Sequence, residues 1–298
     1  MAIATAGRPT KLERTLRALA SLAPASPPFE VIVVLDGDDP PSRALLAKEH
    51  PFPLRVVVQP KAGAGPARNR AAHEARSDLL LLLNDDTRPE AGCLLAHLRA
   101  QEHHGPCLVA GTIVWDPEHE ITPFMEWLAP AGHQFNFARL QSGARMPWGS
   151  VWATNLAVPR AWMLDEPFDP LFPNMGLEDG EWAFRQYRRG RWAVYVPEAV
   201  VYHWHHFAVP ADYRRRAQEF GSAARYVVRR HPELGWRFLV RPTAAAAARL
   251  LSLALPPYWR RETLWDLDFR ISYVFSLMRP RPSLGSQPAA AASGNEQG

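Results

Sequence analysis

The chain has 298 residues, of which 47% are hydrophobic and 21% are charged, a balance typical of a globular protein with a substantial core. Lysine and arginine exceed aspartate and glutamate by 34 to 30, and the net charge of +4 permits an anionic partner. Much of this excess lies in residues 212–230 without any nucleic-acid-binding signature, so we expect no nucleic acid as a partner. The two cysteines, Cys93 and Cys107, form neither a disulfide framework nor a zinc-ligand pattern, which predicts buried thiols in a reducing compartment.

Two segments bear on membrane association. Residues 1–9 lack the order of basic, apolar and small residues found in signal peptides, which predicts a cytoplasmic protein. The apolar segment 243–259 is interrupted by Arg249 and ends in two prolines, short of the roughly 20 residues that a spanning helix needs. Two interpretations stay open for it: a peripheral helix in the membrane interface, or an alanine-rich helix packed on the main domain.

The first part of the chain alternates between strand and helix patterns. β-branched or continuous apolar runs predict strands over residues 1–6, 29–39, 54–60 and 78–86, and the helical spacing of apolar residues predicts helices over 10–22, 41–50 and 65–75. The run Leu79–Leu83 is apolar without alternation, as in a strand buried on both faces. This pattern predicts an α/β fold, with a mostly parallel central sheet flanked by helices.

The remainder is more irregular. We expect a helix from about residue 90 to 102, a strand over 106–117, an aromatic-rich stretch over 124–163, a helix over 178–189 and a strand over 192–196. Residues 211–279 form a predicted helical C-terminal extension, and 280–298, rich in proline, serine and alanine, form a predicted disordered tail.

Acidic residues follow two of the predicted strands. Asp36 ends the second strand, and Asp85 and Asp86 follow the leucine run. Because ligands of open α/β sheets bind at the carboxyl ends of the strands, both clusters are expected at a ligand-binding edge.

The sequence Asn84-Asp85-Asp86 allows two interpretations. Adjacent carboxylates after a buried strand suit Mg²⁺ or Mn²⁺ held on a diphosphate, with phosphate oxygens and water as the other ligands. An ordinary capped turn is equally compatible, since Thr87 and Glu90 have the spacing of a capping box before a helix.

Two later motifs carry polar groups suited to catalysis. Asp179, after Glu178, is of the type that accepts a proton from an acceptor hydroxyl, although acidic residues in a first helical turn are common for electrostatic reasons alone. His203, His205 and His206 follow a predicted strand, where imidazoles ligate metal ions or serve only as structural groups.

Several motifs occur together in a fixed order. They are "ATAGRPTKLERTLRALASL", "EVIVVLDGDD", "GAGPARNRAAHEA", "LLLLLNDDTRPE", "WATNLAVPRAW", "FDPLFPNMGLEDGEWAFRQYRRG" and "VYHWHH". Over about residues 2–206 the chain resembles glycosyltransferase family 2, the inverting enzymes on the GT-A fold. The resemblance implies a catalytic domain over 1–210, with a nucleotide-binding half (1–100) and an acceptor-binding and catalytic half (101–210).

The resemblance also implies site residues. Those expected at the nucleotide and its phosphates are Thr5, Arg8, Asp36, Arg68, Asn84 and Asp85. Asp86 and His203 are the expected metal ligands, Asp179 the catalytic base supported by Glu178, and Trp148 and Asn155 the residues that meet the sugar and acceptor. The chain departs from the family pattern at Asn84, where an aspartate is usual and asparagine brings no charge to the metal, and at Leu35, which replaces the first of two acids.

These features predict a metal-dependent inverting glycosyltransferase that uses a UDP-, dTDP- or GDP-sugar and acts on a glycan or lipid-linked acceptor in cell-surface polysaccharide biosynthesis. A retaining GT-A glycosyltransferase and a nucleotidyltransferase stay open, because a metal and a nucleotide alone do not fix stereochemistry. A non-catalytic sugar-nucleotide or glycan-binding protein is the alternative from another class. Oligomeric state is left open by the sequence.

Overall fold

The computed structural model describes residues 1–129, 134–172, 176–207, 210–252 and 261–278. In this part of the chain, one eight-stranded sheet has the strand order β3-β2-β1-β4-β7-β6-β8-β5. The strands are β1 (Ala2–Thr5), β2 (Val31–Asp36), β3 (Leu54–Gln59), β4 (Leu79–Asn84), β5 (Thr87–Pro89), β6 (Leu108–Trp115), β7 (Asn155–Pro159) and β8 (Ala193–His203).

The sheet is mixed. The pairs β3–β2, β2–β1, β1–β4 and β6–β8 are parallel, whereas β7 is antiparallel to β4 and β6, and β5 is antiparallel to β8. The chain fills one side of β1 with β2 and β3 and then returns to its other side with β4. This reversal makes the β1–β4 pair a topological switch point, the place where open α/β sheets bind their ligands.

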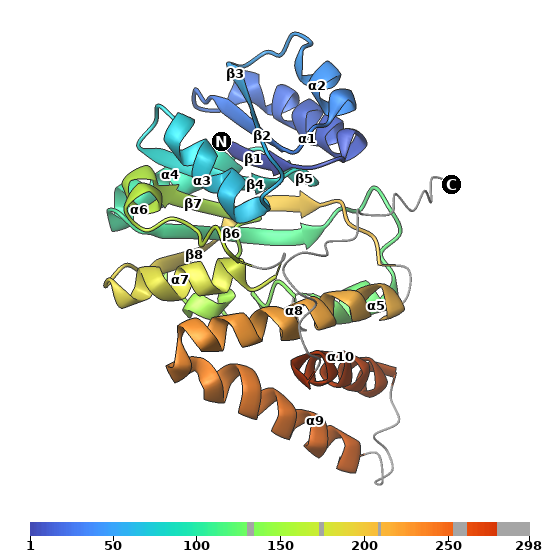
Figure 1. The fold of residues 1–298 in the computed structure, drawn as a ribbon. Coiled ribbons are helices and arrows are strands. Elements are labelled where there is room, and N and C mark those ends of the chain that lie inside the picture. The colour runs from blue at the N-terminus through green and yellow to red at the C-terminus, as the bar shows by residue number, and fades with distance from the viewer. Residues whose placement is uncertain (130–133, 173–175, 208–209, 253–260, 279–298) are drawn as a thin grey trace.

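The helices surround this sheet (Figure 1). They are α1 (Pro9–Leu22), α2 (Pro40–Leu46), α3 (Ala64–Glu74), α4 (Cys93–His104), α5 (Pro123–Leu128), α6 (Arg160–Asp165), α7 (Glu178–Arg188), α8 (Pro210–Arg230), α9 (Arg241–Ser252) and α10 (Arg261–Met278). Short turns of 3-10 or π helix occur at Ala23–Ala25, Trp148–Ser150, Pro232–Leu234 and Trp236–Val240. In Figure 1, α8, α10 and α9 lie one beyond another below the sheet, in orange to red.

Local sequence explains the elements of the first half. Pro9 occupies the first turn of α1, where its missing N–H costs nothing, and Leu12, Leu16 and Leu19 are buried along one face of the helix. All six residues of β2 are buried, and so are the four central positions of β4, as their apolar runs predict. The predicted α/β class and central sheet are therefore confirmed.

The turn after β4 differs from one of the two interpretations of the sequence. Thr87 starts strand β5, and its hydroxyl donates to the carbonyl of Asn84 at 2.8 Å instead of capping a helix. Helix α4 begins only at Cys93, after Gly92, whose φ of 90° is readily available to glycine. The capping box from Thr87 to Glu90 is therefore wrong, because strand pairing with β8 takes Thr87 into the sheet.

The C-terminal region is helical in its described part, as predicted. Helix α10 packs on both α8 and α9, and Phe220, Ala224 and Tyr273 are buried between α8 and α10. Across the described residues we find no helix with the length and apolar character needed to span a bilayer. The predicted disordered tail, residues 280–298, lies outside the described residues, as does part of the segment 243–259.

Candidate active site

The predicted donor-site residues come from three neighbouring strands. Thr5 ends β1, Asp36 ends β2 and Asn84 ends β4, so their side chains lie at one edge of the sheet. Asp36 accepts hydrogen bonds from the side chain of Gln59 and from the backbone N–H groups of residues 62 and 63, each at 2.8 Å. It thereby ties the loop before α3 to the end of β2.

Asp85 connects this edge to helix α1. The hydroxyl of Thr5 donates to its Oδ2 at 2.6 Å, and the guanidinium of Arg8 forms an ion pair with it. The Thr15 hydroxyl donates to the backbone carbonyl of Asp85 at 2.9 Å. Burial raises the pKa of Asp85, and the nearby charge of Arg8 opposes that rise. Asp85 therefore positions Arg8 at the mouth of the site.

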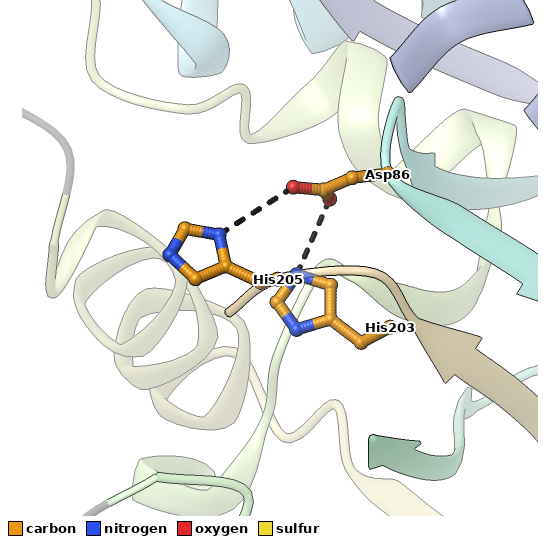
Figure 2. Close-up of side chains that lie close together, drawn as sticks. All are labelled: Asp86, His203 and His205. Carbon is orange, nitrogen blue, oxygen red and sulfur yellow. Dashed lines mark ion pairs between the residues drawn. The ribbon is translucent and has the colours of Figure 1, made fainter. Parts of the chain in front are cut away.

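Asp86 lies between two imidazoles (Figure 2). The Nε2 atom of His203 is 3.2 Å from one carboxylate oxygen of Asp86, and the Nδ1 atom of His205 is 3.7 Å from the other. Lys11 approaches the same carboxylate at 3.2 Å. One ligand atom from each of the three residues, Asp86, His203 and His205, falls within 4.8 Å of the others.

Strand pairing brings these groups together. Thr87 of β5 is paired with His203 of β8, and the backbone N–H of Trp204 donates to the carbonyl of Asp86 at 2.8 Å. His203 and His205, two positions apart on extended chain, both face Asp86. His206 faces away, with its ring against His119.

The protonation states of Asp86 and His205 favour the binding of a cation. Burial disfavours the charged form of Asp86, but His203, His205 and Arg8 outweigh it, so the pKa of Asp86 lies well below its usual value. Burial lowers the pKa of His205 to about 4, which leaves its imidazole neutral near pH 7. One carboxylate and two imidazoles are a donor set that fits a divalent ion such as Mn²⁺. His205 was not among the predicted ligands; its alternation with His203 was the available signal.

Arg68 holds the two acidic residues at the start of α7. Its Nη1 atom is 3.0 Å from Asp179 and 3.3 Å from Glu178, and its side chain is 7% exposed. The backbone N–H of Ala153 donates to the other oxygen of Asp179 at 3.0 Å. Burial raises the pKa of Asp179 to about 6, against the opposing charge of Arg68. A carboxylate with such a pKa is ionised at neutral pH and still basic enough to take up a proton.

The turn before Glu178 has an uncommon backbone conformation. Leu177 has φ 64° and precedes the first helical residue of α7, after Gly176 with φ 129°. The Gly176 N–H donates to Glu178 at 2.6 Å. A left-handed conformation is unfavourable for leucine and is found preferentially at functional turns. Here it sets the direction in which Glu178 and Asp179 leave the loop.

Asn84, at the end of β4, is hydrogen-bonded to Arg68, the partner of the predicted base. Its side-chain oxygen accepts from Arg68 at 3.4 Å, and its amide nitrogen donates to Thr154 at 3.2 Å. The side chain that departs from the family pattern is thus hydrogen-bonded to the partner of Asp179.

Two adjacent hollows share Arg8 and Glu178 in their walls. The first, of about 450 Å³, is lined by Ala4, Thr5, Ala6, Arg8, Asp36, Lys61–Pro66, Asp85, Asp169, Phe172 and Glu178. The second, of about 170 Å³, contains Asp86, His203, His205, Asp179, Arg68 and Asn84. The structure therefore brings the predicted base and the predicted metal ligands into one cavity, next to the hollow lined by Thr5, Asp36 and Asp85.

Neither predicted acceptor residue lines these hollows. Asn155 is 0% exposed, and its side chain is hydrogen-bonded to His97 and to the carbonyls of Thr112 and Ala199, so it joins three strands and helix α4 in the core. Trp148 packs on Phe184 and beneath the guanidinium of Arg237.

Trp152 and Gln134 line the second hollow, and their Nε1 and Oε1 atoms have no hydrogen-bond partner among the described residues. Helix α8 adds Asp212, Arg215, Arg216, Glu219 and Phe220 to the same wall. The sequence placed α8 outside the catalytic domain, and only its i, i+3, i+4, i+7 spacing of polar residues could have indicated a shared face.

The model of the protein family described as glycosyl transferase family 2 matches residues 2–157, just over half of the chain. The chain belongs to glycosyl transferase family 2. Membership confirms the predicted family and the assignment as a glycosyltransferase. The family match ends before Glu178 and Asp179, so the roles of these two residues stay predictions. The sequence matches none of the curated proteins with which it was compared.

Solved structures share the fold at low sequence identity. The mannosyltransferase PcManGT from Pyrobaculum calidifontis, in complex with GDP-Man and Mn²⁺, is 18% identical, with a TM-score of 0.65 over 92% of this chain and 85% of its own. S. aureus TarS 1-349 in complex with UDP is 13% identical, with a TM-score of 0.54 over 93% of this chain and 89% of its own. At such identities the likeness shows the GT-A fold and nothing further about chemistry.

Proposed function

We propose that this family 2 glycosyltransferase moves a sugar from a nucleotide-diphosphate sugar to an acceptor hydroxyl with inversion at the anomeric carbon. The observation that carries the proposal is the presence of Asp179 and the cluster Asp86, His203 and His205 in one cavity. An in-line displacement requires a base and a diphosphate site around one sugar, because attack and departure occur on opposite faces of that sugar.

The proposed donor site is the hollow lined by Thr5, Asp36, Lys61 and Asp85. The fold neighbours support a nucleotide sugar there, since PcManGT was solved with GDP-Man and S. aureus TarS with UDP-GlcNAc. A UDP-, dTDP- or GDP-sugar therefore stays the proposed donor class. Arg8 lies between this hollow and the second one, at the position where a donor's diphosphate would pass from one to the other.

Asp86, His203 and His205 would hold a divalent cation, with Mg²⁺ or Mn²⁺ as the proposed ion. Two imidazole ligands favour Mn²⁺, because Mg²⁺ prefers an all-oxygen shell. When bound, such an ion neutralises negative charge on the departing nucleoside diphosphate.

The residues of the chain account for the remaining steps. Asp179 accepts the proton of the acceptor hydroxyl as the oxygen forms its bond to the anomeric carbon. The bond from that carbon to the donor diphosphate breaks, and the electron pair leaves with the diphosphate. Arg8 and Lys11, both within 3.3 Å of Asp86, supply positive charge beside the leaving group. Arg68 keeps Asp179 in place and ionised until the proton arrives.

Asp179→Asn tests this assignment. The variant should lose transfer while it binds the donor as the wild type does, measured by a thermal-shift screen of nucleotide sugars with and without Mn²⁺. Full activity of Asp179→Asn would remove the residue from the mechanism. Retention of the donor's anomeric configuration in the product would favour the retaining alternative. A protein that binds donors yet neither transfers nor hydrolyses them would be the non-catalytic binding protein.

The proposed site of action is the cytoplasmic face of a membrane, in cell-surface glycan biosynthesis. Of the 13 exposed large apolar residues in the described chain, eight fall between residues 236 and 278: Trp236, Val240, Leu250, Leu251, Leu264, Ile271, Phe275 and Met278. Arg241 and Arg261 are exposed in the same region and lack an ion-pair partner among the described residues. Apolar side chains interspersed with cations complement an anionic phospholipid surface.

Liposome flotation tests this membrane face. The double variant Leu251→Ser with Met278→Ser removes two of its most exposed apolar groups, at 76% and 70% exposure. We expect it to lose most binding to anionic phosphatidylglycerol vesicles. Leu171→Ser, at a 72% exposed leucine in another part of the chain, is the matched control and should bind as the wild type does. A wild-type protein that ignores anionic vesicles would exclude the membrane role.

A further inference from the structure

Helix α8 presents one face to the active-site cavity. Asp212, Arg215, Arg216, Glu219 and Phe220 all line it, and they follow the i, i+3, i+4, i+7, i+8 spacing of a single helix face. Trp152 and the turn that leads to Asp179 line the same cavity. This helix lies beyond the residues matched by the family model.

Arg216 differs from the other arginines of this cavity. Arg8 is paired with Asp85, Arg68 with Asp179 and Glu178, and Arg215 with Glu219 at 3.7 Å. The half-buried Arg216 has no carboxylate within ion-pair distance among the described residues, and its guanidinium lies 5.6 Å from the ring centre of Phe220. A partly desolvated cation that forms no direct ion pair is stabilised when a ligand supplies an anionic partner.

The charge of Arg216 acts within the reaction centre. It lowers the pKa of Asp179, although burial is the larger influence and the pKa remains raised overall. It acts in the same direction on Glu219 of its own helix. Arg216 and Asp179 line the same cavity of about 170 Å³, so the guanidinium is within the reach of a small molecule whose hydroxyl is held at Asp179.

We propose that Arg216 binds an anionic group of the acceptor, a phosphate or a carboxylate carried near the hydroxyl that Asp179 deprotonates. Guanidinium offers two parallel N–H donors that match either group, and it stays protonated throughout the working pH range. Phe220 beneath it shields the ion pair from water on one side. The inference rests on the proposed transfer reaction only in assigning the bound anion to the acceptor.

The donor diphosphate is the competing ligand for this arginine. That diphosphate already has Arg8, Lys11 and the cluster at Asp86 on the wall formed by α1 and the strand ends. Arg216 comes from α8 instead. Filling the donor site first therefore separates the two possibilities.

The test uses the full chain with Mg²⁺ and saturating UDP or GDP, whichever stabilises it more. Glycerol 3-phosphate and propionate are titrated as anionic probes, with glycerol as the neutral match, and binding is followed by ligand-observed NMR. We expect the wild type to bind at least one anionic probe and not glycerol, Arg216→Gln to lose about tenfold or more in affinity, and Arg216→Lys to recover part of it. Arg229→Gln removes the same charge from an exposed position of the same helix and should bind like the wild type.

The outcomes distinguish the proposal from its rivals. A wild type that binds neither anion, or an Arg216→Gln variant that binds both as the wild type does, overturns it. A variant that instead loses UDP or GDP affinity assigns Arg216 to the donor and also overturns it. Melting temperatures of the three variants report whether each one is folded. Failure of the proposed function would show separately, as full transfer by Asp179→Asn or as a wild type that binds no nucleotide sugar.

Discussion

The guanidinium of Arg68 on α3 lies 3.0 Å from the carboxylate of Asp179 on α7, a residue 111 positions later in the chain. The same nitrogen also reaches Glu178. One buried cation thus contacts two largely buried carboxylates, at 12% and 15% side-chain exposure, so the charge state of the proposed base depends on a helix from the opposite half of the fold. Arg68, expected at the donor phosphates, is in this structure committed to the base.

Removing Arg68 should change the pH dependence of kcat/KM more than it changes the affinity for the donor. In Arg68→Ala the two carboxylates lose their counter-ion, so the pKa of Asp179 should rise above about 6 and the acidic limb of kcat/KM should move to higher pH. Arg68→Lys keeps the charge but loses the second donor, and should shift the limb less. An acidic limb that stays in place in Arg68→Ala would show that Arg68 does not tune the base.

The pKa of Asp179 also predicts how the activity of the wild type changes with pH. Because Asp179 must be ionised to accept a proton, activity should fall as pH drops through about 6. The contribution of Asp179 to the stability of the fold changes with pH in the opposite direction. The folded-state pKa is raised, so this group's contribution to stability is complete at low pH and is lost as pH rises through about 6.

Comparison of melting curves for wild type and Asp179→Asn tests that contribution to stability. Asparagine does not titrate, so the melting temperature of Asp179→Asn relative to wild type should increase between pH 5 and pH 8. A tenfold change in the proton affinity of the carboxylate on folding corresponds to about 1.4 kcal/mol, reduced here by whatever water reaches the group. A difference that is constant with pH would place Asp179 in a better solvated environment than the structure gives it.

His205 should matter for metal affinity and His206 should not. His205→Ala removes one of three ligand atoms and should weaken Mn²⁺ binding by at least about tenfold in calorimetric titration. His206→Ala is the matched control, because its imidazole is turned toward Glu120 and His119. Equal loss in the two variants would mean that the effect is structural.

Asn84→Asp restores the residue usual for the family and tests whether this position binds the metal. The asparagine side chain lies between Arg68 and Thr154, so an aspartate should compete for Arg68 and raise the pKa of Asp179. We expect Mn²⁺ affinity to change by less than about a factor of three and the acidic limb of activity to move upward. Much tighter Mn²⁺ binding would instead make position 84 a metal ligand.

The sequence predicted the strands of the first half of the chain well, because each of them follows from a local pattern of residues. Each strand of the first half is an apolar run ending in a polar residue, so Thr5, Asp36 and Asn84 could be placed at one edge without knowledge of distant contacts. The strands after β4 depend instead on pairing between segments far apart in the sequence, such as β5 with β8. The short strand at Thr87 exists because β8 is there to pair with it, and in isolation its residues read as a helix cap.

The positions of Asn155 and Arg216 likewise could not be predicted from the residues around them in the sequence. The predicted residue Asn155 lies three positions after Trp152, which lines the cavity, in a segment without clear periodicity. The pairing of β7 with β4 and β6 places Asn155 in the core. Arg216 belongs to a basic run that is typical of a solvated helix face. Its place in the cavity depends on the packing of α8 as a whole.

Because α8 lines only the second hollow, the two hollows are lined by largely different segments of the chain. The proposed donor hollow is lined by residues before 86, apart from Asp169, Phe172 and Glu178, whereas helix α8, which begins after residue 209, contributes five residues to the lining of the second hollow. On the proposed assignment, we expect that replacing the cavity-facing positions of that helix in a chimaera changes the acceptor preference and leaves donor use unchanged. The proposed acceptor preference would then depend on five side chains on one helix face.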